Sequence, residues 1–191
     1  MPVQIGQKPD HALTEPLGLL SDCHRRIERF LGVLVTLAGT ARGGPLAEDR
    51  RQSLAAALQY FREAAPKHTA DEEESLFPRL RAAGGPEIAE VLAEVEHLES
   101  EHAYADRLHR EVDQLGNEWL RAGTLPAEPA VRLSDLTTEL SSIYKTHIEM
   151  EDTRLFPLAR RVLGAAAQRE IGEEMAARRG RVSAARSPQN G

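Results

Sequence analysis

The sequence predicts an all-α fold: an antiparallel four-helix bundle of the up-and-down type, with a short fifth helix at the C-terminus and a disordered tail. Of its 191 residues, 41% are apolar and only 4% are aromatic, and Ala, Leu, Glu and Arg are abundant. This composition favours helices over sheets. Gly and Pro cluster at 39–45, 84–86 and 123–129. Such short breaks connect antiparallel neighbours in a bundle.

Four long helices are expected between these breaks, over 15–38, 47–82, 86–121 and 130–162. Each carries apolar residues three and four positions apart, which is the spacing of a buried helix face. Pro66 and Pro78 lie within the second helix and should bend it, because proline lacks the N–H that a helix needs.

A shorter helix is expected at 165–178, where Ile171 and Met175 lie four residues apart and can cover one end of the bundle. The residues after it are polar and basic without periodicity, which indicates disorder. The predicted organisation is an N-terminal arm at 1–13, the bundle at 14–163, the C-terminal helix at 164–179 and the disordered tail at 180–191.

Composition also excludes several classes of function. The net charge of −6 argues against nonspecific binding of nucleic acid, which needs a basic face. No apolar run is long enough to span a membrane, and the first residues lack the apolar core of a signal peptide. The one cysteine, Cys23, cannot form an intramolecular disulfide. A cytoplasmic protein is therefore expected, with no membrane or nucleic-acid partner and with any protein partner undefined.

One stretch of the sequence occurs twice. It reads H-T-A-D-E-E-E-S-L-F-P from His68 and H-I-E-M-E-D-T-R-L-F-P from His147. In each copy a histidine is followed four residues later by a glutamate, Glu72 or Glu151. Residues four apart lie on the same side of a helix, so each pair can reach a single metal centre.

Two further histidines occupy positions where the apolar faces of the first and third helices call for a Leu or Ile. They are His24 and His102. An internal repeat relates these two histidines. Shifting the first half of the sequence onto the second aligns His68 with His147, and a nearly equal shift aligns His24 with His102. The chain therefore reads as two copies of a helix pair that face each other across a pseudo-two-fold axis.

A metal site explains these polar groups at core positions. A buried imidazole or carboxylate is costly unless it is paired, hydrogen-bonded or metal-bound. The candidate ligands provide mixed nitrogen and oxygen ligation, which suits iron or manganese better than a thiolate-rich zinc site. Two octahedral ions would keep open positions for a bridging group and a small ligand such as dioxygen. The predicted ligands are His24, His68, Glu72, His102, His147 and Glu151.

Other polar residues are alternative candidates for ligands. Glu72 is preferred within its acidic run because the repeat aligns Asp71 with Met150, while Glu73 falls five residues after His68. Glu28 and Asp106 follow His24 and His102 by four residues, so each can be an extra ligand, an acceptor for imidazole N–H or a surface charge. His97 points off the face of His102, and His109 lies two turns away from it. His11, Tyr144 and Cys23 are expected to have structural roles.

The pattern resembles the hemerythrin-like, HHE cation-binding family, in which successive helices carry His, His-x3-Glu, His and His-x3-Glu. The resemblance covers about residues 14–162. It implies a non-haem di-iron site with two iron ions, bridged by an oxo or hydroxo group, in preference to manganese or zinc. The oxygen-carrying invertebrate hemerythrins have a second histidine on the third helix and end with His-x4-Asp. This chain lacks both features, so its site should be more open.

Three functions follow from this resemblance. The first is a di-iron protein that binds dioxygen, nitric oxide or peroxide for sensing, detoxification or iron handling. The second is a di-iron oxidase or peroxidase-type enzyme, which requires a substrate channel or an electron donor. The third is a helical interaction module with a vestigial metal site. The repeated His/Glu pattern favours the first two over the third.

Overall fold

The computed structural model describes residues 11–180, and these residues form helices and short turns with no β-strand among them. The predicted all-α helical bundle is confirmed. The arm predicted at 1–13 and the disordered tail predicted at 180–191 fall almost entirely outside the described residues. Within the described part, no helix is long and apolar enough to cross a membrane.

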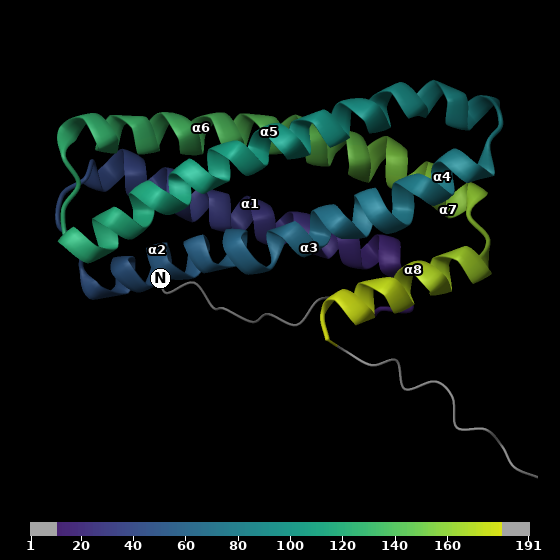
Figure 1. The fold of residues 1–191 in the computed structure, drawn as a ribbon, viewed down its shortest axis with the longest axis horizontal. Helices are drawn as coiled ribbons and strands as arrows, with labels where there is room; N and C mark the ends of the chain where they lie inside the picture. Colours follow the sequence, from purple (N-terminus) through teal and green to yellow (C-terminus); the bar gives the residue numbers. More distant parts are fainter. Residues whose placement is uncertain (1–10, 181–191) are drawn as a thin grey trace, which may run out of the picture.

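Four helical rods alternate in direction around a common core (Figure 1). The first is α1 (Pro16–Ala41) and the third is the unbroken α5 (Pro86–Ala122). Both pack against the second and fourth rods, so α1 and α5 lie diagonally opposite each other. The second rod comprises α2 (Glu48–Glu63), α3 (Ala65–Ala70), η1 (Asp71–Leu76) and α4 (Phe77–Ala83). The fourth comprises α6 (Ala127–Met150), η2 (Glu151–Leu155) and α7 (Phe156–Val162).

Pro66 and Pro78 both interrupt the second rod, but in different ways. The helix breaks at Ala64, just before Pro66, because the residues that precede a proline disfavour a regular helix. Near Pro78 the expected bend is replaced by η1, a π-helical turn that ends before the proline. The wider turn, closed by the bond from Phe77 N–H to the Glu72 carbonyl, removes the clash between the proline ring and the preceding turn.

The fourth rod repeats this feature. Its π-helical turn η2 begins at Glu151 and is followed by Pro157 in the first turn of α7. Phe156 N–H bonds to the Glu151 carbonyl, just as Phe77 N–H bonds to the Glu72 carbonyl. The twice-used stretch therefore encodes a shared backbone geometry as well as a shared pair of side chains. π-helical turns of this kind occur frequently at functional sites.

The core consists of two apolar clusters at opposite ends of the bundle. One cluster contains Leu34, Leu54, Trp119 and Leu136, among others. The other contains Leu20, Phe77, Leu98, Phe156 and further residues. His24 separates the two along α1, because Leu20 precedes it and Ile27 follows it. A buried polar layer therefore crosses the bundle between two apolar halves.

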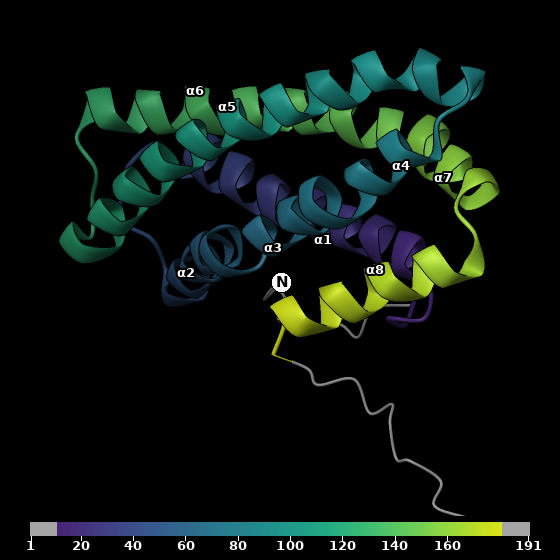
Figure 2. The same ribbon diagram turned by 45° about the vertical axis from the view of Figure 1, so that its right-hand side comes forward.

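The predicted fifth helix is α8 (Ala165–Arg178), which turns back and lies along α1 and η1 (Figures 1 and 2). Ile171 and Met175 are fully buried in the second apolar cluster, so the helix contributes to the core. Its polar side reaches the acidic run of η1. Asp71, which is fully buried, pairs with Arg178 and Arg179 at N–O distances of 3.0 and 2.5 Å.

Candidate metal centre

The six predicted ligands lie together in the buried polar layer. His24 comes from α1, His102 from α5, and the two His/Glu pairs come from the second and fourth rods. The exposed fraction of these six residues is 8% at most, and both glutamates have an exposed fraction of 0%. Glu72 and Glu151 each lie at the beginning of a π-helical turn, where the helix of the second or the fourth rod is widened.

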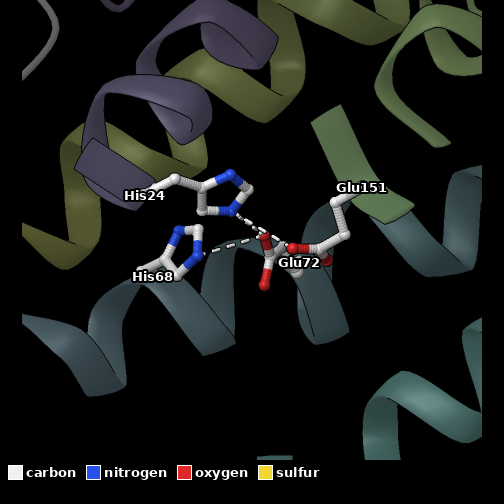
Figure 3. A group of neighbouring side chains, drawn as sticks. All are labelled: His24, His68, Glu72 and Glu151. Carbon is white, nitrogen blue, oxygen red and sulfur yellow. Dashed lines mark ion pairs between the residues drawn. The ribbon is translucent and has the colours of Figure 1, made fainter. Parts of the chain in front are cut away.

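His24, His68, Glu72 and Glu151 form one group of four (Figure 3). His24 Nε2 lies 3.1 Å from Glu151 Oε2 and 3.8 Å from Glu72 Oε1. His68 Nε2 lies 3.3 Å from the same Glu72 oxygen. One ligand atom from each of these residues lies within 4.8 Å of all the others, which is close enough to surround a single cation.

Glu72, His102, His147 and Glu151 form a second group with the same spacing. Here His147 Nε2 lies 3.3 Å from Glu151 Oε2, and His102 Nε2 lies 3.5 Å from Glu72 Oε2. Nε2 atoms of the two histidines are 3.1 Å apart. The two groups share both carboxylates and differ in their histidines. This arrangement suits two neighbouring cations with the glutamates between them.

Three of the four histidines have a carboxylate at the outer nitrogen. Nδ1 of His24 lies 3.2 Å from Asp152, and Nδ1 of His102 lies 2.9 Å from Glu73. Nδ1 of His147 lies 2.9 Å from Glu101. The contacts of His102 and His147 are hydrogen bonds, whereas that of His24 has the distance of an ion pair without hydrogen-bond geometry. A hydrogen-bonded carboxylate orients the ring, fixes which nitrogen carries the proton and increases the basicity of the inner nitrogen.

The spacing of residues within one helix does not identify these outer carboxylates, although the internal repeat points to two of them. Glu73 and Asp152 occupy equivalent positions in the two copies, and each contacts the lone histidine of the other half of the repeat. The position equivalent to Glu101 is Cys23. His68 Nδ1 has no hydrogen-bond partner among the described residues. The two halves of the site are therefore chemically unequal.

The electrostatics of the cluster fit a bound cation. Burial lowers the pKa of His24, but the carboxylates of Asp152, Glu151 and Glu72 outweigh this effect and hold the pKa well above its ordinary value. Burial and the charge of Glu151 raise the pKa of Glu72 to about 7. Without a cation, the cluster retains protons that balance the charge of the carboxylates. A bound metal would take over this role and displace those protons.

Hydrogen bonding gives a second test of the fit. Both side-chain oxygens of Glu72 and both of Glu151 are buried, and none accepts a hydrogen bond of normal geometry in the described part of the chain. His24 Nε2 is likewise buried and makes no hydrogen bond of normal geometry with the described residues. Buried polar atoms are costly without partners, and metal coordination would satisfy all of these atoms together. The residues present therefore fit a pair of cations.

The alternative candidate residues lie outside the two groups. Glu28 is exposed, and Asp106 pairs with Arg110 on the surface. The His97 side chain is 71% exposed and contacts Glu101, so it reaches the site only through that carboxylate. His109 contacts the Tyr144 hydroxyl at 3.2 Å, and His11 pairs with Asp22. Cys23 is buried and belongs to neither group.

Glu101→Gln should weaken metal binding by roughly 10- to 100-fold, as expected when an outer hydrogen-bond partner of a ligating histidine is lost. The amide keeps the shape of the side chain but removes the charge that supports His147. Competition with a chelator would measure the affinity. Glu96→Gln, an exposed position on the same helix, is the matched control. Equal affinities in the two variants would contradict a role for Glu101.

The fold and the buried cluster together define a four-helix bundle of the cation-binding type. Comparison with known families places the chain within that class. It belongs to the hemerythrin HHE cation-binding family, whose domain matches residues 15–159. The chain is also similar to an uncharacterized protein of Haemophilus influenzae, with 28% identity over 166 residues that cover 86% of this chain and 90% of that protein.

Proposed function

We propose that this chain is a non-haem di-iron protein that binds dioxygen or a related small molecule, nitric oxide or peroxide, for sensing, detoxification or iron handling. The supporting observation is the pair of four-residue groups that share Glu72 and Glu151. Imidazole and carboxylate ligands without thiolate favour iron over zinc. Manganese is the second choice because it accepts the same ligands. The single buried thiol, Cys23, is consistent with a reducing, cytoplasmic location.

Each residue then has a defined task. His24 and His68 would hold one ion, His102 and His147 would hold the other, and the two glutamates would lie between them. Bound iron would supply redox chemistry and open coordination positions for a small ligand. The outer carboxylates keep the imidazole rings oriented, and the apolar clusters on both sides exclude bulk water.

Metal analysis combined with an optical spectrum tests this proposal. Protein purified in air should contain about two irons per chain and absorb in the near ultraviolet through ligand-to-metal charge transfer. His68→Ala and His147→Ala should each lose metal, because each removes a nitrogen from one group. A metal-free protein whose stability is unchanged in both variants would contradict the proposal.

An enzymatic function is the alternative that one observation favours. A cavity of about 440 Å³ has His102 in its lining, so a substrate has a route to the cluster. An oxidase or peroxidase would consume peroxide or dioxygen through many cycles, whereas a sensor or carrier would bind it once. Adding peroxide to the reduced, iron-loaded protein and following its consumption distinguishes turnover from stoichiometric binding.

A further inference from the structure

The cavity of about 440 Å³ lies between the second rod and α5 and is called here the α3–α5 cavity. Phe61, Ala65 and Pro66 form an apolar wall at the turn where α2 gives way to α3. His102 and Tyr144 lie in its lining, next to the cluster. The volume lies within the range of small-ligand pockets, about 300–1,000 Å³.

The two halves of the cluster differ in access. The ring of His24 stacks on Phe156 at a centroid distance of 5.3 Å and meets the ring of His68 edge-on at 4.9 Å. Exposure alone does not separate the halves, because all four histidines are buried, with exposed fractions between 1% and 8%. A second cavity, of about 390 Å³ between α5 and α6, touches the cluster at His147. Both cavities therefore approach the His102/His147 half, and the other half is closed by aromatic packing.

The α5–α6 cavity is the less suitable route for an apolar gas. His97 and Glu101 are paired within its lining, and Glu101 covers Nδ1 of His147. Arg154 also pairs with Glu94, which lines the same cavity. A molecule that follows this path must pass between charged groups. In the α3–α5 cavity Glu73 covers Nδ1 of His102 in the same way, but Phe61, Ala65 and Pro66 add an apolar wall that dioxygen or nitric oxide can follow past the carboxylates.

Charge in the α3–α5 cavity selects against anions. Glu73, Glu99 and Asp106 all contribute carboxylates to its lining, and its described lining includes no Lys or Arg. Arg81 and Arg110 pair with Glu99 and Asp106 from outside the lining. An anion that enters must approach these charges in a region of reduced dielectric constant. The Tyr144 hydroxyl, 3.2 Å from His109 Nε2, offers a neutral hydrogen-bonding group in the same lining.

We propose that small uncharged molecules, such as dioxygen, nitric oxide or neutral hydrogen peroxide, reach the metal centre through the α3–α5 cavity and bind on its His102/His147 side. The inference rests on the proposed function, because it takes the cluster to hold metal. Both metal groups offer the same ligand types, two imidazoles and two shared carboxylates. Access rather than ligand chemistry therefore decides where the small molecule binds.

The chain offers a matched pair of positions for a test. Ala103 lines the α3–α5 cavity and Ala93 lines the α5–α6 cavity, and both are exposed residues of the same helix. Tryptophan at either position should fill its cavity without disturbing the core. Circular dichroism checks the fold of each variant. Thr69→Phe, which obstructs the α3–α5 cavity from the opposite wall, replaces Ala103→Trp if that variant fails to fold.

The first measurement uses metal-free protein and dissolved dioxygen, whose paramagnetism accelerates the relaxation of nearby protons. The methyl protons of Ala65 should relax faster under oxygen than under nitrogen in the wild type and in Ala93→Trp. This effect should disappear in Ala103→Trp. An absent effect in the wild type, or one that Ala103→Trp leaves unchanged, would overturn the proposed route. This measurement does not depend on iron.

The second measurement uses iron-loaded protein and the rate of ligand binding after rapid mixing. Ala103→Trp should slow nitric oxide binding roughly tenfold, because it closes the proposed path in a close-packed interior, and Ala93→Trp should not. Glu99→Gln should accelerate azide binding about threefold and leave nitric oxide unchanged, since only azide is charged. The opposite order of the two tryptophan variants would disprove the route. A chain that shows the oxygen effect but takes up no iron would refute the proposed function alone.

Discussion

Glu151→Gln should lose both metal ions, whereas His68→Ala should lose only one. Glu151 belongs to both groups of four, but His68 belongs to one. The amide is neutral and cannot replace the shared charge. The affinity for each ion should therefore fall by more than about 100-fold, beyond the loss seen when only an outer partner is removed. Metal content after dialysis, measured by elemental analysis, should fall from two ions per chain to none in Glu151→Gln and to one in His68→Ala.

Glu149→Gln is the matched control for this experiment, since Glu149 is exposed two residues away and undergoes the same change. It should keep both ions. Retention of both ions by Glu151→Gln would show that the carboxylate is not shared. Loss of both ions from His68→Ala would contradict the division of the cluster into two overlapping groups.

Asp71→Asn should destabilise the protein by about 3 kcal/mol, which is the effect of breaking a buried ion pair and leaving its partners uncompensated. Asp71 has an exposed fraction of 0% and contacts guanidinium nitrogens of both Arg178 and Arg179. It also lies directly before Glu72 in η1, so its loss should loosen the turn that carries a shared ligand. Urea unfolding of the metal-free protein would measure the free energy.

Glu74→Gln provides the comparison within the same turn. Glu74 also pairs with Arg178, at 3.0 Å, but its side chain is 66% exposed. A solvent-exposed pair contributes little, so this variant should lose no more than about 0.5 kcal/mol. If Asp71→Asn and Glu74→Gln lowered the free energy of unfolding by similar amounts, burial would not strengthen the ion pairs of Asp71. In that case these ion pairs would not be what holds α8 against η1.

The sequence contains most of the information about the bundle. Gly and Pro mark the connections because they disrupt helices, so the helix ends fall within a few residues of those predicted. The histidines at apolar positions reveal the polar layer because a core cannot accept an imidazole without a partner. The repeat then selects Glu72 over Asp71, and the structure places Asp71 against α8 instead.

Features that depend on contact between helices could not be predicted in the same way. Glu101 reaches His147 across the interface of α5 and α6, so its role depends on how the two helices are rotated rather than on spacing within either. The backbone widening before Pro78 depends on the choice between a bend and a π-helical turn, and local sequence does not determine that choice. The cavities likewise arise from side chains of several rods.

The shared carboxylates have a mechanical consequence. The first half of the repeat contributes His24, His68 and Glu72. Each half of the repeat completes its group of four only with one carboxylate from the other half. Bound ions would therefore act as cross-links between the two helix pairs. Separating the halves would break bonds to both ions at once, which raises the barrier to unfolding. The loaded protein should consequently open slowly and resist proteases, even where its equilibrium stability is ordinary.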